Sequence, residues 1–407
     1  MPPDSTNLDF NGSDQPRTPG LATRLSHAGR AGTHVRAFVN PPVHRGSTML
    51  HVDIADRIAG SKQRLEQAPT YGVHGNPTHH ALEDVVAEIE GGTRCQIVSS
   101  GLAAVTTSLL TYLKAGEHCL MPDSVYGPAR NFANGLMTDL GITATFYDPN
   151  ATSEALETLF RDNTTVLYLE SPGSHTFEVQ DVPALAALAH RRGAKVLLDN
   201  TWGIHFFQPF QHGVDVSIQA LTKYVVGHSD VLLGSITVAN DAEWARVRLG
   251  ALQLGQYASP DDCWLALRGV RTMAIRLERQ MRSGLIVAEW FASRPEVQQV
   301  LHPALPGAPG HDLWRRDFTG ACSLFGVAFK PNIALAATHR MIDSLQLFGI
   351  GASWGGFESL ALPTTGFLTR TTGSGHFDGP VCRFHIGLED PVDLIADLEQ
   401  AFHALHG

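Results

Sequence analysis

The feature that most constrains this chain of 407 residues is an alternation of short apolar runs with longer helix-period segments, from about residue 70 to residue 257. Runs such as CQIVSS, EHCLMP and TTVLYLE are nearly continuous in hydrophobicity, as strands buried on both faces are. Each is followed by an amphipathic stretch, for example LAAVTTSLLTYL. Strands that alternate with helices build βαβ units, so the sequence predicts an α/β fold with a mostly parallel sheet flanked by helices.

The segments on either side of this region predict the domain plan. Residues 1–20 are polar and are expected to form a disordered tail, without the basic and apolar pattern of a leader. Residues 21–68 are expected to form an N-terminal arm that ends in a helix from Thr48 to Ser61. The large domain is predicted to span 69–262, and a smaller α+β domain 263–407.

Composition limits the compartment and the partners. Acidic residues outnumber basic ones by 40 to 30, and no Lys/Arg run could follow a phosphate backbone, so neither nucleic acid nor a membrane is an expected partner. No apolar run approaches the roughly 20 residues that a membrane span needs. The five cysteines are widely spaced without a CxxC pair, which favours a reducing cytoplasm and predicts no metal site.

Two polar residues follow predicted strands of the sheet. Asp199 ends the apolar run KVLLDN, where a carboxylate is costly to bury unless a cation such as a protonated ring nitrogen faces it. Lys223 follows the run SIQALT, and a desolvated lysine has the lowered pKa that a Schiff-base amine requires. Each alone also fits a surface residue. Together they favour one site, because ligands bind at the carboxyl ends of parallel strands.

A strand-to-helix junction and a loop aromatic could complete such a site. The stretch from Ser99 to Ala104 turns from a strand into a helix, whose first amides would face an anion such as phosphate. The same residues also suit an ordinary helix cap. Tyr126 follows the next strand, where its ring could stack on a planar cofactor or pack against the loop.

One pattern favours a different reaction class. Residues 351–355 match the G-x-S-x-G motif around Ser353, and Asp378 and His385 follow in the chain order of an α/β-hydrolase triad. The match lies beyond the βαβ region, and no long helix is expected after it. A serine hydrolase is therefore the less favoured alternative, and a non-catalytic binding protein is another.

Eight short motifs occur in the order found in the pyridoxal-phosphate enzymes of cysteine and methionine metabolism, and from about Thr23 onwards the chain resembles that family. The motifs are Tyr71-Gly72…Gly75-Asn76-Pro77-Thr78, Ser100-Gly101-Leu102, Asp123-Ser124-Val125-Tyr126-Gly127, Glu170-Ser171-Pro172-Gly173-Ser174, Asp199-Asn200-Thr201-Trp202, Thr222-Lys223-Tyr224…Gly227-His228-Ser229, Ser353-Trp354-Gly355-Gly356 and Arg383…His385-Ile386-Gly387-Leu388-Glu389-Asp390. The forms SPGS and SWGG are more similar to members that act at Cβ than to γ-acting ones.

The resemblance implies a fold-type I transferase-like subunit with pyridoxal 5'-phosphate as its cofactor. It implies that Lys223 bonds to the cofactor and takes the substrate proton, that Asp199 keeps the ring nitrogen protonated, and that Tyr126 stacks on the ring. Further cofactor contacts are implied for Gly101, Leu102, Thr222, Ser174 and Tyr71. Substrate contacts are implied for Arg383, Ser353 and Trp354.

The implied reaction is β-elimination from cystathionine or another cysteine S-conjugate, which yields a thiol, pyruvate and ammonia. A γ-acting member of the family is the nearest alternative. The resemblance also implies a homotetramer built from two dimers, in which Tyr71 reaches the active site of the neighbouring subunit.

Two positions depart from the family pattern. Many members have an arginine two residues after the tyrosine, as a cofactor-phosphate contact, and this chain has Val73 followed by His74. Many also have a serine three residues before the lysine, where this chain has Ala220. We therefore expect weaker retention of the cofactor, because a charge-assisted contact worth about 1.5–3 kcal/mol is missing.

Overall fold

The computed structural model describes residues 19–30, 38–63, 65–68, 70–373 and 375–406 of the chain. The expected disordered tail, residues 1–20, lies outside the described residues except for its last two positions. No helix among the described residues is long and apolar enough to cross a membrane.

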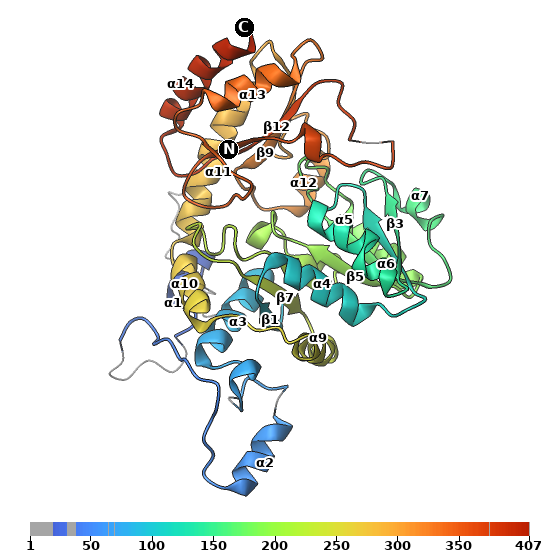
Figure 1. Ribbon diagram of the computed structural model, residues 1–407, viewed down its shortest axis with the longest axis vertical. Coiled ribbons are helices and arrows are strands. Elements are labelled where there is room, and N and C mark those ends of the chain that lie inside the picture. Colours follow the sequence, from blue (N-terminus) through green and yellow to red (C-terminus); the bar gives the residue numbers. More distant parts are fainter. Residues whose placement is uncertain (1–18, 31–37, 64, 69, 374, 407) are drawn as a thin grey trace, which may run out of the picture.

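The larger sheet, of which β1, β3, β5 and β7 are labelled in Figure 1, has seven strands in the order β1-β7-β6-β5-β4-β2-β3. Strand β7 runs antiparallel to both of its neighbours, and the other neighbouring strands are parallel to each other. The strands are β1 Arg94–Val98, β2 His118–Pro122, β3 Thr143–Tyr147, β4 Thr164–Glu170, β5 Lys195–Asp199, β6 Val216–Gln219 and β7 Gly234–Val238. The predicted α/β fold with a mostly parallel sheet is confirmed.

Two hydrophobic clusters cover the two faces of this sheet, because successive strand residues point to opposite sides. On one face, Leu197 and Val216 pack with helices α4 (Gly101–Tyr112), α5 (Gly127–Asn134), α6 (Leu136–Asp139) and α9 (Asp241–Gln253). On the other face, Val196 and Leu198 pack with α3 (Pro77–Glu90), α7 (Ser153–Glu157), α8 (Val182–Arg191) and α10 (Pro260–Val270).

A second sheet of five strands, in the order β10-β11-β12-β9-β8, lies toward the C-terminal end of the chain. Its strands are β8 Val297–Leu301, β9 Leu324–Phe329, β10 Gly349–Ile350, β11 Leu360–Pro363 and β12 Val381–His385. Its cluster of apolar side chains includes residues of α11 (Met273–Ala292), α13 (Leu335–Asp343) and α14 (Pro391–Phe402). The remaining short helices are α12 His311–Asp317, η1 Gly72–His74, η2 Ile204–Phe206, η3 Pro209–His212, η4 Thr365–Phe367 and η5 His403–Leu405.

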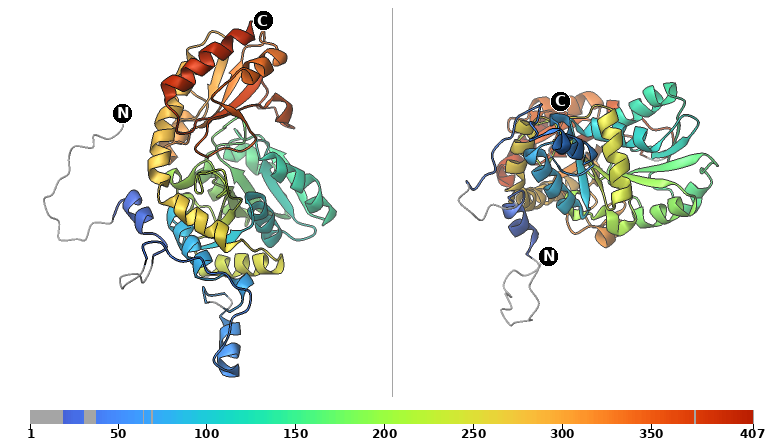
Figure 2. Two further views of the ribbon diagram at one scale, coloured as in Figure 1. Left: turned by 60° about the vertical axis from the view of Figure 1, so that its left-hand side comes forward. Right: turned by 90° about the horizontal axis from the view of Figure 1, so that it is seen from below.

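Helix α11 joins the two parts of the molecule (Figure 2). Met273 and Leu277 near its start belong to the apolar cluster of the larger sheet. Val287 and Phe291 near its end belong to the cluster of the second sheet. One continuous helix therefore sets the position of strand β12 relative to the carboxyl ends of β4, β5 and β6.

The N-terminal arm differs from its prediction in two ways. It contains a first helix, α1 (Leu21–His27), which is anchored by the buried side chain of Leu25. Its second helix, α2, spans Ile54–Lys62 and begins six residues later than expected, because Asp53 caps it by accepting a hydrogen bond from the Asp56 amide. Helix α2 projects away from the rest of the chain (Figure 1), and none of its residues is buried.

Candidate active site

The predicted lysine lies between the two sheets. Lys223 occupies the turn that follows β6, and its amine donates a 2.8 Å hydrogen bond to the hydroxyl of Ser353, which precedes β11. The Lys223 amine also lies 5.2 Å from the centroid of the Trp354 ring. Burial and the nearby Arg383 lower the pKa of Lys223 to about 8, although Asp199 acts in the opposite direction. About a tenth of the amine is therefore neutral and nucleophilic at pH 7, far more than for an ordinary lysine.

Asp199 ends strand β5, and its partner in the register of the neighbouring strand β4 is Glu170. Burial raises the pKa of Asp199, and this effect is opposed by hydrogen bonds from Thr201 and by the charge of Lys223. Thr201 donates to the same carboxylate oxygen from its amide, at 3.0 Å, and from its hydroxyl, at 2.6 Å. Asp199 forms no ion pair within the described ranges, so its second oxygen suits a cationic group of a ligand.

Glu170 fixes the backbone of the predicted stacking residue. Its carboxylate accepts a 2.7 Å hydrogen bond from the Tyr126 amide at the start of α5. Burial and the neighbouring Asp199 raise the pKa of Glu170 well above its ordinary value. The Tyr126 side chain itself is 42% exposed, so its ring is accessible to a planar ligand.

The start of helix α4 lies against the turn that carries Lys223. A Cβ atom on Gly101 would lie 2.5 Å from the side chain of Ala220, so glycine is required for this close approach. Ser100 caps the helix by accepting from the Ala103 amide, and the amides of Gly101 and Leu102 belong to the first turn, which has no acceptors within the helix. These amides can therefore receive a phosphate.

Thr222 precedes the lysine in the same turn. Its hydroxyl donates to the carbonyl of Leu233 at 3.1 Å and accepts from the Leu233 amide at 3.0 Å. The oxygen that was expected to contact phosphate is thus held in place by the backbone that leads into β7. Ser174, another expected contact, lies in the turn after β4, where its amide donates to the Ser124 carbonyl at 2.8 Å.

Arg383 reaches the site from the second sheet. It lies on β12 and is 6% exposed, and one guanidinium nitrogen donates to the carbonyl oxygens of Ala352 and Ser353 at 2.9 and 3.0 Å. Burial lowers the pKa of Arg383 to about 10, which still leaves the group charged at neutral pH. Arg383 and Lys223 are therefore connected through a single residue, Ser353, whose carbonyl contacts one and whose hydroxyl contacts the other.

Tyr71 lies apart from this cluster. Its side chain is 50% exposed and lines a surface pocket of about 490 Å³ together with Val73, Arg45 and Asp261. The pocket shares no lining residue with the surroundings of Lys223. Arg45 forms an ion pair with Asp261 on the rim of the pocket.

The serine hydrolase alternative lacks its geometry. The Ser353 hydroxyl accepts from Lys223, and His385 is not its partner. The Nε2 atom of His385 accepts from the Gly355 amide at 3.1 Å, and its Nδ1 atom lies 3.3 Å from the Ser323 hydroxyl. No group of side chains suited to hold a metal ion occurs in the part of the chain that the structure describes.

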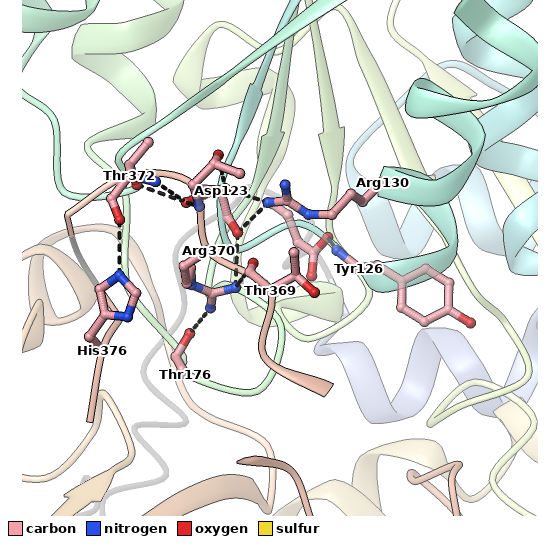
Figure 3. A network of polar contacts seen from close by, with 10 residues as sticks. Asp123, Tyr126, Arg130, Thr176, Thr369, Arg370, Thr372 and His376 are labelled. Carbon is pink, nitrogen blue, oxygen red and sulfur yellow. Dashed lines mark hydrogen bonds and ion pairs between the residues drawn. The ribbon is translucent and has the colours of Figure 1, made fainter. Parts of the chain in front are cut away.

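A network around Asp123 was missed by the sequence analysis (Figure 3). Asp123 directly follows β2 and is fully buried. Its carboxylate accepts hydrogen bonds from the amides and hydroxyls of Thr371 and Thr372, and it forms an ion pair with Arg130 at 2.5 Å. Arg370 donates to the Asp123 carbonyl at 2.9 Å and to the Thr176 hydroxyl at 2.6 Å. This network fastens the segment before β12 to the loop that leads to Tyr126.

Comparisons with known proteins identify the family. The profile described as Cys/Met metabolism PLP-dependent enzyme matches residues 22–403. The chain belongs to this family. The cystathionine beta-lyase of Bordetella avium is 43% identical over 94% of this chain and 97% of its own length, and the cystathionine beta-lyase MetC of Escherichia coli is 39% identical over 94% and 98%. The structure of MetB from Corynebacterium glutamicum matches 96% of this chain and 99% of its own, with a TM-score of 0.87 and 30% identity.

Membership in the family makes this chain a carbon–sulfur lyase that depends on pyridoxal 5'-phosphate. The residues at the carboxyl ends of the strands of the larger sheet fit that cofactor. Lys223 offers an amine of lowered pKa, Asp199 offers a carboxylate that forms no ion pair with any described residue, and the start of α4 offers amides that have no acceptor within the helix for a phosphate.

Proposed function

We propose that this lyase cleaves L-cystathionine between Cβ and sulfur, takes up one water molecule, and releases homocysteine, pyruvate and ammonia. The observation that carries the proposal is the chain of contacts from Lys223 through Ser353 to Arg383, which joins a cofactor-side amine to a guanidinium suited to a substrate carboxylate. The names of the relatives from Bordetella avium and Escherichia coli support cystathionine as the substrate.

Lys223 is the group that we assign to proton transfer. When bound, pyridoxal phosphate supplies an electron sink for charge that develops at the substrate Cα atom. The Lys223 amine has a pKa of about 8, so it can hold a proton at one stage and release it at another near neutral pH. Its hydrogen bond to Ser353 orients the amine toward the side of the site where Arg383 lies.

Asp199 and Tyr126 are assigned to the cofactor ring. The Asp199 carboxylate would keep a proton on the ring nitrogen, and the two hydrogen bonds from Thr201 hold it in one orientation. Tyr126 would cover one face of the ring, since its backbone is fixed by Glu170 and its side chain is accessible. Gly101, Leu102, Thr222 and Ser174 are assigned to cofactor binding beside them.

Arg383 is assigned to the substrate α-carboxylate. Its hydrogen bonds to the carbonyl oxygens of Ala352 and Ser353 hold the planar guanidinium in one plane, as a bidentate contact with a carboxylate requires. Trp354 packs on Tyr224 with ring centroids 5.5 Å apart, which limits the space for water beside the Lys223 amine.

We further propose that two chains share each active site and that two such dimers form a homotetramer. Tyr71 and its pocket lie on the surface, away from Lys223, as expected for a residue that serves a neighbouring subunit. The arm also exposes apolar side chains that a second copy would cover, with Leu50 91% and Val52 95% exposed. Mixing Tyr71→Phe protein with Lys223→Ala protein, each inactive alone, is expected to restore activity in the mixed dimers.

We propose the cytoplasm as the compartment. All five cysteines are buried, and none is paired in a disulfide bond. A thiol product such as homocysteine also persists best in a reducing compartment.

The deciding experiment for the reaction is product analysis with L-cystathionine. The purified protein, loaded with pyridoxal phosphate, is expected to release pyruvate and a free thiol identified as homocysteine. Release of 2-oxobutyrate and cysteine would instead make the chain a γ-acting member of the family. A Lys223→Ala variant serves as the control and is expected to release neither keto acid.

A further inference from the structure

A buried carboxylate lies behind the site, at the last residue of helix α3. Glu90 is fully buried and accepts a 2.9 Å hydrogen bond from the side-chain amide of Asn200. It also accepts hydrogen bonds from the Ser217 hydroxyl and the Gln219 side-chain amide. Asn200 directly follows strand β5, and Ser217 and Gln219 belong to the neighbouring strand β6, of which Gln219 is the last residue.

Both strands lead directly to residues assigned to the cofactor. Asn200 immediately follows Asp199, and Gln219 lies four positions before Lys223. Because successive residues of a strand point to opposite faces, Asp199 faces one side of the sheet, whereas Asn200 faces the other, where α3 packs. Glu90 therefore contacts, from the rear of the sheet, the two chain segments that present Asp199 and Lys223 at its front.

Two glycines allow the helix end to come this close. Gly91 ends α3 with a φ of 69°, which glycine adopts at little cost. A Cβ atom on Gly92 would lie 2.5 Å from the Thr237 side chain of β7 and 3.0 Å from the carbonyl of Val238. Glycines at these two positions let the backbone after α3 lie close against β7. The Glu90 side chain can therefore reach its donors beside β5 and on β6.

Glu90 has no cation to balance it. No ion pair of Glu90 occurs among the described residues, and its three partners are neutral side chains. Burial raises the pKa of Glu90 to about 7, although the three hydrogen bonds act against this rise. A buried carboxylate without a cation costs folding free energy, which a leucine at this position would avoid.

We propose that Glu90 is a positioning residue, which ties the ends of β5 and β6 together from the rear of the sheet and so sets the spacing between Asp199 and Lys223. The inference rests on the cofactor roles proposed above for those two residues. Lost contacts would let the two strand ends move apart, and the cofactor, which is held by both, would bind less tightly.

The test separates the hydrogen bonds from the charge of Glu90. Glu90→Met removes all three contacts, whereas Glu90→Gln keeps them, because its oxygen can accept from Asn200 and Gln219 and its amide can donate to Ser217. Val85→Ala creates a cavity at a buried position of the same helix. It is the matched control, because it lowers stability without touching the Glu90 hydrogen bonds. Gln219→Leu removes a single contact and serves if Glu90→Met does not fold.

The measurements are the dissociation constant of pyridoxal phosphate from titration of cofactor-free protein, the pH midpoint of the visible absorption band, and the melting temperature. We expect Glu90→Met to weaken cofactor binding about tenfold and to move the midpoint by about half a pH unit, with Glu90→Gln within about twofold of wild type. Gln219→Leu should act in the same direction as Glu90→Met, to a smaller extent. Val85→Ala should lower only the melting temperature.

Two results would overturn the inference alone. The first is that Glu90→Met binds the cofactor as tightly as wild type and keeps the wild-type pH midpoint. If Glu90→Met does not fold, the same result in Gln219→Leu would count. The second is that Val85→Ala loses as much cofactor affinity as Glu90→Met when the two variants have the same melting temperature. If wild type itself forms no visible band that depends on Lys223, the proposed cofactor roles fail, and this inference fails with them.

Discussion

Glu170 and Asp199 are register partners at the ends of the adjacent parallel strands β4 and β5. Two carboxylates thus meet at one edge of the site, but their partners differ. Glu170 accepts from the Tyr126 amide, and Asp199 accepts from Thr201. Burial raises the pKa of Glu170, and the neighbouring charge of Asp199 raises it further, because like charges at adjacent positions disfavour double ionisation. Asp199 is then the carboxylate that we propose as the anion for the cofactor ring.

The first prediction concerns Glu170 as a hydrogen-bond acceptor. Glu170→Gln retains an oxygen that can accept from the Tyr126 amide, so we expect kcat within about threefold of wild type. Glu170→Ala leaves this amide without its acceptor and is expected to lower kcat/KM about tenfold, or about 1.4 kcal/mol. Steady-state kinetics with cystathionine provides the measurement. Equal losses in both variants would show that the charge, and not the acceptor, matters.

A second prediction concerns the acid side of the pH profile. Burial raises the pKa of Asp199, and hydrogen bonds from the Thr201 amide and hydroxyl oppose this rise, so loss of the hydroxyl in Thr201→Val raises the pKa further, although the amide still donates. In the role proposed for it, Asp199 must be ionised to hold the ring nitrogen, and activity is therefore expected to be lost at a higher pH as the solution is acidified. The acid limb of kcat/KM should move upward in Thr201→Val and stay in place in Thr201→Ser, which keeps the hydroxyl. An unmoved limb in the valine variant would contradict this role for Asp199.

The third prediction addresses the substrate-binding role proposed for Arg383. A lysine at this position keeps the charge but loses the planar pair of donors, so we expect the kcat/KM of Arg383→Lys to fall about a hundredfold. Cofactor binding should be unchanged, because the hydrogen bonds of Arg383 within the described residues go to the carbonyl oxygens of residues 351–353 and not to Asp199 or the start of α4. Absorbance titration with pyridoxal phosphate is the control. A parallel loss of cofactor affinity would place Arg383 in a structural role.

Stability against acid tests the network around Asp123. Burial alone would raise the pKa of Asp123, but hydrogen bonds from Thr372, Arg130 and Thr371 outweigh burial and lower it to about 2. The ionised group stabilises the fold above its unfolded-state pKa of about 4, and this contribution is lost as the pH falls from about 4 to 2. Asp123→Asn should lower the free energy of unfolding at pH 7 by about 3 kcal/mol.

Chemical denaturation at pH 7 and at pH 3 is the measurement for this variant. The difference between Asp123→Asn and wild type should shrink at the lower pH, because wild type loses part of its advantage there. Asp139→Asn, at an exposed helix end, is the control and should leave the stability unchanged at pH 7 within about 0.5 kcal/mol. A difference independent of pH would contradict the contribution of the Asp123 charge.

The last prediction concerns cofactor retention. Val73 lines the surface pocket beside Tyr71, where many family members have an arginine. Val73→Arg is expected to slow cofactor dissociation about tenfold, because a charge-assisted contact with the phosphate would be restored in the proposed dimer. Dialysis followed by absorbance gives the rate. Val73→Leu controls for side-chain size, and an unchanged rate in the arginine variant would show that position 73 does not limit retention.

Local features of the chain were readable without the tertiary structure. The alternation of apolar runs and helical periods predicted the parallel sheet, and the strand end at Asp199 and the turn at Lys223 were placed from neighbouring residues alone. The predicted start of α2, Thr48, was wrong. Several polar residues near it could cap a helix, and only the backbone conformation shows that Asp53 does so.

Contacts between distant segments were not readable. Asp123 is joined to Thr371, and Glu90 to Asn200 and Ser217, across more than a hundred residues in each case. No periodicity or spacing connects such positions, since they become neighbours only through the order of the strands and the path of helix α11.

The sequence by itself determined the fold class, the family and the residues able to carry its chemistry, because hydrophobic period and motif are properties of short segments. Only the tertiary structure decided that Ser353 pairs with Lys223 and not with His385, and that a glutamate behind the sheet holds two of its strand ends. The physical reason is that these choices depend on which surfaces the long-range packing brings within hydrogen-bond distance.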